Sequence, residues 1–272
     1  MDIESLNRLI SSIEEKTKSK EWKDGLESRK KEEADFHDYS HDMTTELENK
    51  KFYKTTQLSS DYLEKWLKDN VKDKIFLDYA CGNGVTANKA AIFGSAFTIG
   101  IDISPGSISN AQNLAKKYSH DKITRFFVGD CENTGLPDNS IDVILCAGML
   151  HHLDLNYAYP EMHRILKTGG KIIALEALAY NPIIKAYRML TPEMRTEWEK
   201  HHILSMRDVK LASKFFKIKN VKFWHITSFA AAFLGSPKWI LSFLDSVDSV
   251  LTKIPLIKLL SWQFTFELEK EK

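Results

Sequence analysis

Residues 75–87 decide the fold of this chain, and they read Ile75-Phe76-Leu77-Asp78-Tyr79-Ala80-Cys81-Gly82-Asn83-Gly84-Val85-Thr86-Ala87. The apolar residues at the start predict a strand, the small residues after them predict a tight turn, and a helix is expected over 84–91. Glycine in such a turn allows positive φ angles and lets the backbone approach a ligand closely. The spacing Gly82-x-Gly84-x-x-Ala87 also matches the dinucleotide-binding fingerprint G-x-G-x-x-A, although a turn without a ligand would have a similar sequence.

Two acidic residues near this turn narrow the choice of ligand. Asp102 follows Gly82 by 20 residues, which is the position where a carboxylate accepts hydrogen bonds from ribose hydroxyls. Asp78 lies just before the turn, where its charge would repel an anionic pyrophosphate and attract an ammonium group. The expected ligand is therefore an adenosine with a positively charged tail, and S-adenosylmethionine has this structure.

Short apolar runs alternate with helical segments outward from this turn, as far as about residue 178. The further strands are expected at 97–101, 123–128, 141–146 and 171–175, and the helices at 107–117 and 157–166. Strands that alternate with helices form right-handed βαβ units around a parallel sheet. The fold class is therefore α/β.

The C-terminal part of the chain is expected to add two edge strands and further helices to this sheet. Apolar and polar residues alternate over 262–269, which is typical of an antiparallel strand with one buried face, and 221–226 is expected beside it. Helical segments are predicted on the substrate side at about 180–216 and 236–258. In the second, a stripe with Trp239, Phe243 and Leu244 indicates core contact, with contact to an apolar acceptor as the alternative.

The N-terminal 73 residues are expected to be a separate helical segment that packs on or covers the cofactor site. Apolar residues recur every three or four positions between Ile3 and Ile13, and the charges over 29–33 indicate a solvated helix face; a mobile arm is the alternative. Residues 74–272 are expected to form the main domain.

Four motifs occur in order along this domain. They are Asp78-x-Ala80-Cys81-Gly82-x-Gly84, Gly100-Ile101-Asp102-Ile103-Ser104, Gly129-Asp130-Cys131-Glu132 followed by Leu136-Pro137-Asp138-x-Ser140-Ile141-Asp142, and Leu166-Lys167-x-Gly169-Gly170. Together they give residues 75–177 a resemblance to the class I S-adenosylmethionine-dependent methyltransferases, in the group that contains quinone-biosynthesis and natural-product enzymes. Ala80 departs from the pattern, since a glycine is commoner at that position.

The resemblance implies a fold and a cofactor site. The fold would be a Rossmann-like, doubly wound, seven-stranded sheet that is mostly parallel with its last strand antiparallel. Asp130 would bind the adenine amino group, and Cys131 would lie beside the ring. The cofactor would be S-adenosylmethionine, with S-adenosylhomocysteine as product. The expected cofactor-binding residues are Asp78, Ala80, Cys81, Gly82, Asn83, Gly84, Asp102, Ile103, Ser107, Gly129, Asp130, Cys131, Glu132, Cys146, Ala147 and Gly148.

The loop after the fourth strand, residues 146–154, is expected to face the sulfonium and the substrate, because ligands bind beyond the carboxyl ends of parallel strands. Methyl transfer needs mainly positioning, but an oxygen acceptor also needs a base. His151 and His152 are the candidate catalytic residues, since an imidazole titrates near neutral pH. Packing against the next helix is the alternative role for this pair. Glu176 and the His201-His202 pair are further candidates.

Composition and charge exclude several classes of protein. The 272 residues are 43% hydrophobic and 28% charged, as in an ordinary globular protein. A net charge of +1 does not suggest a nucleic-acid binder. The loop after the fourth strand also lacks the Asn/Asp-Pro-Pro-aromatic motif of enzymes that methylate nucleobase or amide nitrogens, so DNA is not an expected substrate.

The three cysteines form no C-x-x-C pair, and Cys146, His151 and His152 lack a defined ligand spacing, so no metal site is expected. The N-terminus lacks the pattern of a secretory signal, and no apolar run is long enough for a transmembrane helix. The expected location is the cytoplasm.

The sequence therefore predicts a methyltransferase that acts on a small organic acceptor, with oxygen as the favoured atom. An NAD(P)-dependent oxidoreductase and a non-catalytic S-adenosylmethionine-binding module are the alternatives. The acceptor, the base and the oligomeric state stay open. Whether the helix at 239–254 contacts substrate, core or a membrane surface is also open, although Asp245 and Asp248 on its polar face argue against anionic lipid.

Overall fold

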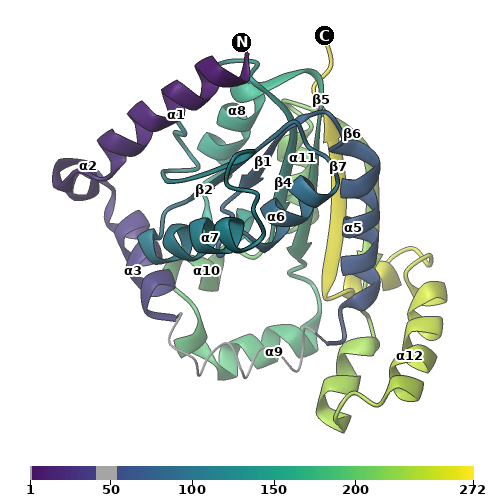
Figure 1. Cartoon of the computed structure of the whole chain (residues 1–272). Coiled ribbons are helices and arrows are strands. Elements are labelled where there is room, and N and C mark those ends of the chain that lie inside the picture. The colour runs from purple at the N-terminus through teal and green to yellow at the C-terminus, as the bar shows by residue number, and fades with distance from the viewer. Residues whose placement is uncertain (1, 41–53) are drawn as a thin grey trace.

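The computed structural model describes residues 2–40 and 54–272, and a seven-stranded sheet forms its centre (Figure 1). The strand order is β3-β2-β1-β4-β5-β7-β6. The strands are β1 (Ile75–Tyr79), β2 (Phe97–Asp102), β3 (Thr124–Val128), β4 (Ile141–Ala147), β5 (Leu166–Ala177), β6 (Lys217–Trp224) and β7 (Gln263–Glu269). Every pairing is parallel except those of β7 with β5 and β6. The predicted sheet, with its last strand antiparallel, is confirmed.

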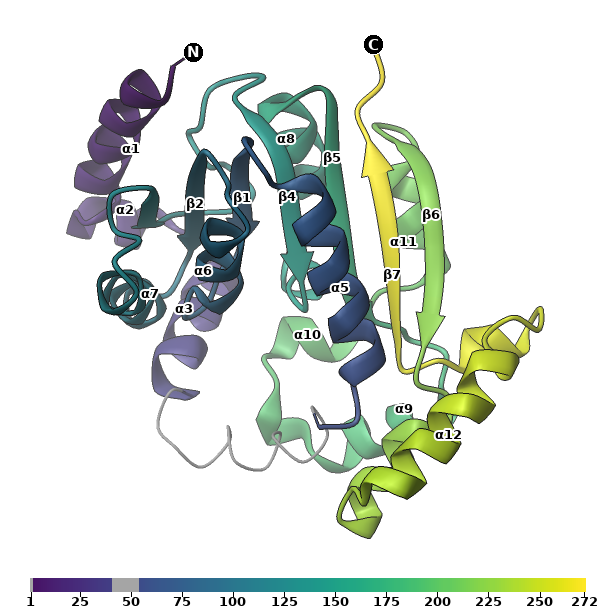
Figure 2. The same cartoon turned by 45° about the vertical axis from the view of Figure 1, so that its right-hand side comes forward.

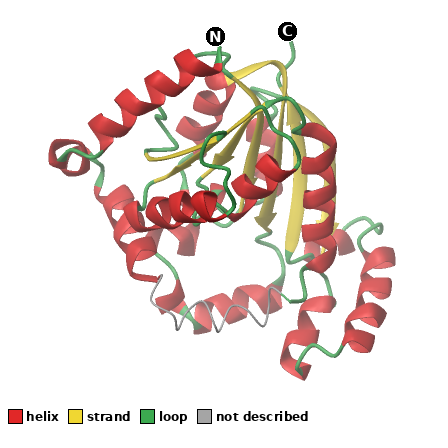
Figure 3. Ribbon diagram, viewed as in Figure 1, coloured by secondary structure: helices red, strands yellow, loops and turns green. Residues whose placement is uncertain are grey.

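Helices cover both faces of the sheet (Figures 2 and 3). The α-helices are α1 (Ile3–Thr17), α2 (Lys20–Gly25), α3 (Ser28–Ser40), α5 (Gln57–Asn70), α6 (Val85–Ile92), α7 (Pro105–Lys117), α8 (Leu155–Ile165), α9 (Pro182–Leu190), α10 (Glu197–His201), α11 (Met206–Ala212) and α12 (Lys238–Leu251). The 3₁₀ helices are η1 (Leu150–His152), η2 (Pro192–Met194), η3 (Ser228–Leu234) and η4 (Ile257–Leu260). None of these helices is both long and apolar enough to cross a membrane.

The central strands are buried on both faces, which explains their continuous apolar runs. Along β1, Leu77 and Tyr79 pack into a cluster with α8 and α11, whereas Phe76 points to the other face and packs with α5. Because successive side chains of a strand alternate between faces, one short run supplies both halves of the core.

Helix α1 confirms the amphipathic helix predicted at the N-terminus. Its side chains Leu6 and Ile10 are buried in the same core cluster as Phe127 of β3. Asp2 caps the helix by accepting a hydrogen bond from the backbone N–H of Ser5 at 2.8 Å. The chain then turns through α2 into α3, and the two views show α3 beside α7 at the carboxyl ends of the parallel strands (Figures 1 and 2).

The strand expected beside the last one is confirmed, because Val221 and Phe223 of β6 pair with β7. Its bounds differ from the expected 221–226, since β6 runs over Lys217–Trp224 and an edge strand tolerates exposed lysines. One expectation about the C-terminal part was wrong. The stripe on α12 is not core: Trp239 is 73% exposed and Phe243 is 65% exposed. The helix instead turns Asp248 inward, as described below.

Candidate active site

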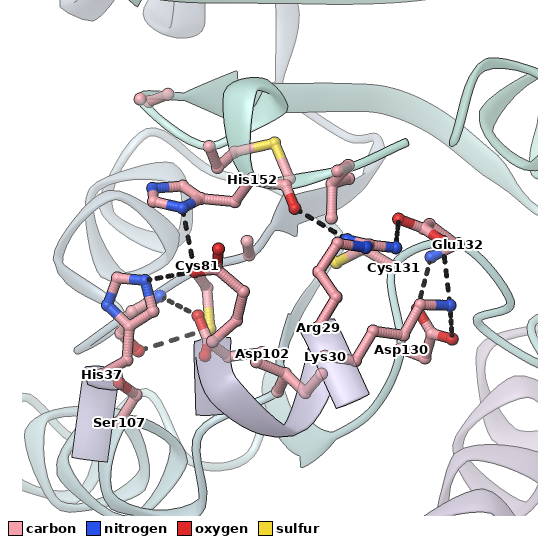
Figure 4. A pocket seen from close by; sticks show the side chains of 18 of the residues that line it. Arg29, Lys30, His37, Cys81, Asp102, Ser107, Asp130, Cys131, Glu132 and His152 are labelled. Atoms are coloured by element: carbon pink, nitrogen blue, oxygen red, sulfur yellow. Dashed lines mark hydrogen bonds and ion pairs between the residues drawn. The ribbon is translucent and has the colours of Figure 1, made fainter. Parts of the chain in front are cut away.

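A cavity of about 300 Å³ lies at the carboxyl ends of β1, β2, β3 and β4, beneath α3 (Figure 4). Of the residues expected at the site, those that line it are Ala80, Cys81, Gly82, Asn83, Asp102, Ile103, Ser107, Asp130, Cys131, Glu132, Ala147, Gly148 and His152. Those that do not line it are Asp78, Gly84, Gly129, Cys146 and His151. The structure thus gathers the ends of β1, β2, β3 and β4 into one crevice, as a doubly wound sheet does.

The turn after β1 has a left-handed backbone at three positions. The φ angles are +55° at Ala80, +49° at Gly82 and +71° at Gly84. A Cβ built on Gly82 would meet no atom within 4 Å, whereas one on Gly84 would lie 2.7 Å from the Cβ of Ala111. Gly82 therefore leaves its surroundings open, and Gly84 allows α6 and α7 to pack closely.

Asp102 ends β2 and organises this turn. Its Oδ2 accepts a hydrogen bond from the backbone N–H of Gly82 at 2.8 Å, and its Oδ1 accepts one from Ser104 at 2.9 Å. A carboxylate offers about four acceptor positions. Asp102 also lines the cavity, which is where a ligand's hydroxyl groups could reach its carboxylate.

Asp78 lies behind the turn as a buried carboxyl group. Its Oδ2 has no hydrogen-bond partner among the residues that the structure describes. Its pKa is raised to about 8, mainly by burial; the backbone N–H of Ala87 lowers the pKa and the charge of Asp102 raises it. A positively charged group that reached this carboxyl would satisfy it and restore its charge.

Asp130 and Glu132, which follow β3, are paired with cations of α3. Lys30 Nζ lies 2.7 Å from Oδ2 of Asp130 and 2.8 Å from Oε2 of Glu132. Arg29 lies 2.7 Å from Oε1 of Glu132 and donates to the carbonyl oxygen of His152 at 2.9 Å. These contacts fasten α3 over the cavity (Figure 4).

The two adjacent histidines have different surroundings. His151 Nδ1 lies 2.8 Å from Oε2 of Glu176, and the other oxygen of Glu176 accepts the backbone N–H groups of Met149 and Leu150. His151 is buried outside the cavity lining and, together with Glu176, holds the loop after β4 in shape. His152 lines the cavity instead.

His152 forms an ion pair with a residue of the N-terminal segment. Its Nδ1 lies 3.0 Å from Oε2 of Glu33. Burial alone would lower the pKa of His152, but Glu33 outweighs it and holds the pKa above the ordinary value of 6.5. Glu33 also accepts a hydrogen bond from the hydroxyl of Thr196, and its own pKa is lowered by these partners in spite of its burial.

The same residues could hold a metal ion. Ligand atoms of Glu33, His37 and His152 lie within 4.8 Å of one another, as do those of two other groups in the described residues, His151-His152-Glu199 and His225-Asp245-Asp248. The expectation of no metal site stays a prediction.

The three cysteines are unpaired and lie in different surroundings. Cys81 and Cys131 line the cavity, whereas the thiol of Cys146 lies in the core, 3.7 Å from the sulfur of Met162. Burial, followed by the charges of Asp102 and Asp78, raises the pKa of Cys81 well above its ordinary value. The nearby helix N-terminus does not overcome these effects.

Sequence reasoning missed the contribution of α3, namely Arg29, Lys30, Glu33 and His37. These residues lie in a run of charges that was interpreted as a solvated face. A signal was present: Glu33 and His37 are four residues apart, so they share one side of a helix. Met149 and Leu153 also line the cavity, and they belong to the loop 146–154 that was expected to face the substrate.

A doubly wound sheet with a glycine turn after β1 and an acid at the end of β2 defines the class of nucleoside-binding Rossmann-like domains. Residues 77–174 match a family model described as a methyltransferase domain. The match lies over the stretch that contains the four motifs, and it agrees with the resemblance to the class I S-adenosylmethionine-dependent methyltransferases that they predicted.

Named relatives and solved structures agree with this family. The chain is 31% identical over 137 residues to a 27-O-demethylrifamycin SV methyltransferase of Amycolatopsis mediterranei, covering 50% of this chain and 48% of that protein. It is 34% identical over 113 residues to a demethylmenaquinone methyltransferase of Bacteroides fragilis, covering 41% and 46%. The chain thus spans about half the length of these curated relatives.

The fold is similar to that of solved methyltransferases. A geranyl diphosphate C-methyltransferase from Streptomyces coelicolor A3(2) aligns with a TM-score of 0.57 at 16% identity, covering 78% of this chain and 79% of that chain. A putative sarcosine dimethylglycine methyltransferase from Galdieria sulphuraria aligns with a TM-score of 0.58 at 15% identity, covering 79% and 88%. At this identity the likeness establishes the fold.

Proposed function

We propose that this protein binds S-adenosylmethionine in the cavity and transfers its methyl group to an oxygen atom of a small, partly apolar acceptor. The observation that carries the proposal is that the His152–Glu33 ion pair and Asp102 line the same cavity. A proton acceptor is thus present beside the strand ends where an adenosine is expected.

The residues around the cavity fit this cofactor. Asp102 would accept the ribose hydroxyls, and the unpartnered Oδ2 of Asp78 would face the ammonium group of the amino-acid tail. Asp130 would accept the adenine amino group and share its carboxylate with Lys30. Cys131 would lie beside the ring, and Gly82 and Gly148 leave room, since a Cβ on either would meet nothing within 4 Å. When bound, the cofactor supplies an electrophilic methyl group.

His152 is the proposed general base. Since Nδ1 pairs with Glu33, Nε2 is the nitrogen proposed to accept a proton from an acceptor hydroxyl. Glu33 stabilises the imidazolium that forms, because the two charges lie 3.0 Å apart in a mostly buried place. A base in this position is needed for a hydroxyl group, and this is why oxygen is proposed as the methylated atom.

The acceptor is proposed to be small and partly apolar. Met149 and Leu153 contribute apolar side chains to the cavity lining beside His152. Two relatives are named for methylating a demethylrifamycin and a demethylmenaquinone, and both of these are organic acceptors. The three unpaired cysteines suit a reducing compartment, and the cytoplasm is kept as the proposed location.

Turnover on a panel of phenols and hydroquinones tests this proposal, with methylated product identified by mass spectrometry. The His152→Ala variant should lower turnover by about 10²- to 10⁴-fold while it leaves the affinity for S-adenosylhomocysteine within about threefold of the wild type. The matched variant His151→Ala should instead lower the melting temperature, because it leaves the buried Glu176 without its imidazole partner. Full turnover by His152→Ala on an accepted substrate would show that His152 is not the base.

A further inference from the structure

Helix α12 is amphipathic, yet it leaves several large apolar side chains in solvent. Trp239 and Phe243 are mostly exposed and Val250 is 59% exposed, while other apolar side chains of the helix are half-buried. An aromatic residue left in water loses the free energy that its burial would provide. This arrangement therefore needs a reason.

The reason lies in two acidic residues that α12 turns toward η3. Asp248 is 2% exposed, and its Oδ1 accepts hydrogen bonds from the backbone N–H of Thr227 at 2.8 Å and from its hydroxyl at 2.7 Å. Its Oδ2 accepts one from the N–H of Ser228 at 3.0 Å. Asp248 thereby satisfies the donors at the start of η3 and fixes the rotation of α12.

Asp245 lies on the same inward side of α12. Its Oδ1 is buried, and burial together with the neighbouring Asp248 raises its pKa to about 6. Because Asp248 is buried and one oxygen of Asp245 is buried, these two acids weigh less against contact with anionic lipid than their place on the polar face suggests.

The exposed apolar residues continue beyond α12. The set, called here the docking surface, consists of Phe233 and Leu234 of η3, Trp239, Phe243 and Val250 of α12, and Ile254, Leu256 and Leu260 after it. Figures 1 and 2 show α12 standing out from the sheet, at the end to which the carboxyl ends of the parallel strands point. The α9 helix lies at the same end, and it also exposes Met189 and Leu190.

The charges on this surface are of one sign. Between Ser228 and Leu260 the basic residues are Lys238, Lys253 and Lys258, and the only acids are the two that face inward. Lys238 precedes Trp239 and Lys253 precedes Ile254, and both lysines are exposed. The outward face thus combines large apolar side chains with cations and carries no carboxylate.

We propose that the docking surface binds the surface of an anionic lipid bilayer. Tryptophan and phenylalanine partition into the boundary between headgroups and acyl chains, while lysine side chains extend to the anionic headgroups. A second copy of this chain fits less well, because a symmetric dimer through this surface would bring like-charged lysines together. Docking here places the end of the molecule that carries the cavity next to the membrane.

Sedimentation of the full chain with vesicles tests the proposal, and no cofactor or substrate is added. Binding to phosphatidylglycerol vesicles is expected to exceed binding to phosphatidylcholine vesicles by about tenfold or more and to weaken as salt is raised. The Trp239→Ser/Phe243→Ser variant should lose most of this binding, and the charge variant Lys238→Glu/Lys253→Glu should lose the preference for the anionic lipid. The control Ile92→Ser/Tyr118→Ser changes two exposed apolar residues elsewhere and should bind as the wild type does.

Three results would overturn the proposal. The wild type could fail to sediment with either lipid, or it could bind both lipids equally and without salt dependence. It could also be a dimer that the Trp239→Ser/Phe243→Ser variant dissociates, without vesicle binding, in which case the surface joins two copies. None of these results bears on methyl transfer, because the measurement uses neither cofactor nor acceptor.

Discussion

At the scale of single residues, Asp78 lies in an environment far from that of a free side chain. Its pKa of about 8 in the folded protein lies above the value of 3.8 that it has when unfolded. Between these two values the folded protein holds a proton that the unfolded chain has released. Stability therefore falls as pH rises through this window, and the loss is complete above about pH 8.

The Asp78→Asn variant should remove this pH dependence. Urea unfolding at pH 5 and pH 8 should show that the wild type loses stability between the two values, while the variant loses less. The variant should also bind S-adenosylhomocysteine at least tenfold more weakly, since it cannot pair with an ammonium group. Equal pH dependence of the two proteins would mean that Asp78 stays ionised without ligand.

Ala80 is the one position where the first motif departs from the family pattern, and the backbone is strained there. Its φ of +55° lies in the left-handed region, which costs an L-residue about 1–2 kcal/mol. Glycine at this position would relieve the strain. It would also lower the stability by about 0.4–1 kcal/mol, because glycine increases the conformational entropy of the unfolded chain. Ala80→Gly should therefore raise the free energy of unfolding by up to about 1 kcal/mol, measured by denaturant titration. A drop in stability would show that the methyl group contributes packing that outweighs the strain.

At the scale of elements, α3 connects the N-terminal segment to the site through Lys30. The Lys30→Gln variant removes both ion pairs, with Asp130 and Glu132, so α3 should detach more readily. Dissociation of S-adenosylhomocysteine, followed by stopped-flow displacement, should become about tenfold faster or more. The matched control is Lys31→Gln on the same helix, whose ammonium group donates to the carbonyl of Asp24 instead. An unchanged rate in Lys30→Gln would mean that α3 does not retain the ligand.

The sequence predicts those elements whose signal is local. The strands from β1 to β5 are short apolar runs between turns, and the acids at their ends follow the motif spacing. Helix α3 has no such signal, because its partners Asp130 and Glu132 lie about 100 residues away and a run of mixed charges looks the same on a solvated face. The orientation of α12 was missed for a similar reason: only the fold shows that the N–H groups at the start of η3 draw Asp248 inward.

The two adjacent histidines show the same limit of prediction from sequence within a single loop. The sequence identifies both as candidates, and their adjacency offers no way to choose. The choice depends on two carboxylates that pair with different imidazoles. Glu176 of β5 pairs with His151, and Glu33 of α3 pairs with His152. Long-range packing therefore separates a residue that shapes the loop from the proposed base.

At the scale of the whole molecule, one sheet brings the ends of β1, β2, β3 and β4 to a single cavity, and α3 lies over it. In the sheet, β2 and β3 lie on one side of β1, and β4 and β5 lie on the other side. The point at which the strand order reverses is therefore between β1 and β4. This is where open α/β sheets bind their ligands. The central claim is that this cavity binds S-adenosylmethionine rather than a dinucleotide.

Calorimetric titration with S-adenosylhomocysteine, alongside an identical titration with NADPH, tests that claim most directly. We predict saturable binding of one S-adenosylhomocysteine per chain and no binding of NADPH. In the Asp102→Asn variant the affinity for S-adenosylhomocysteine should fall by roughly ten- to a hundredfold or more, which corresponds to about 1.5–3 kcal/mol. Binding of NADPH without binding of S-adenosylhomocysteine, or an Asp102→Asn affinity equal to that of the wild type, would contradict the account.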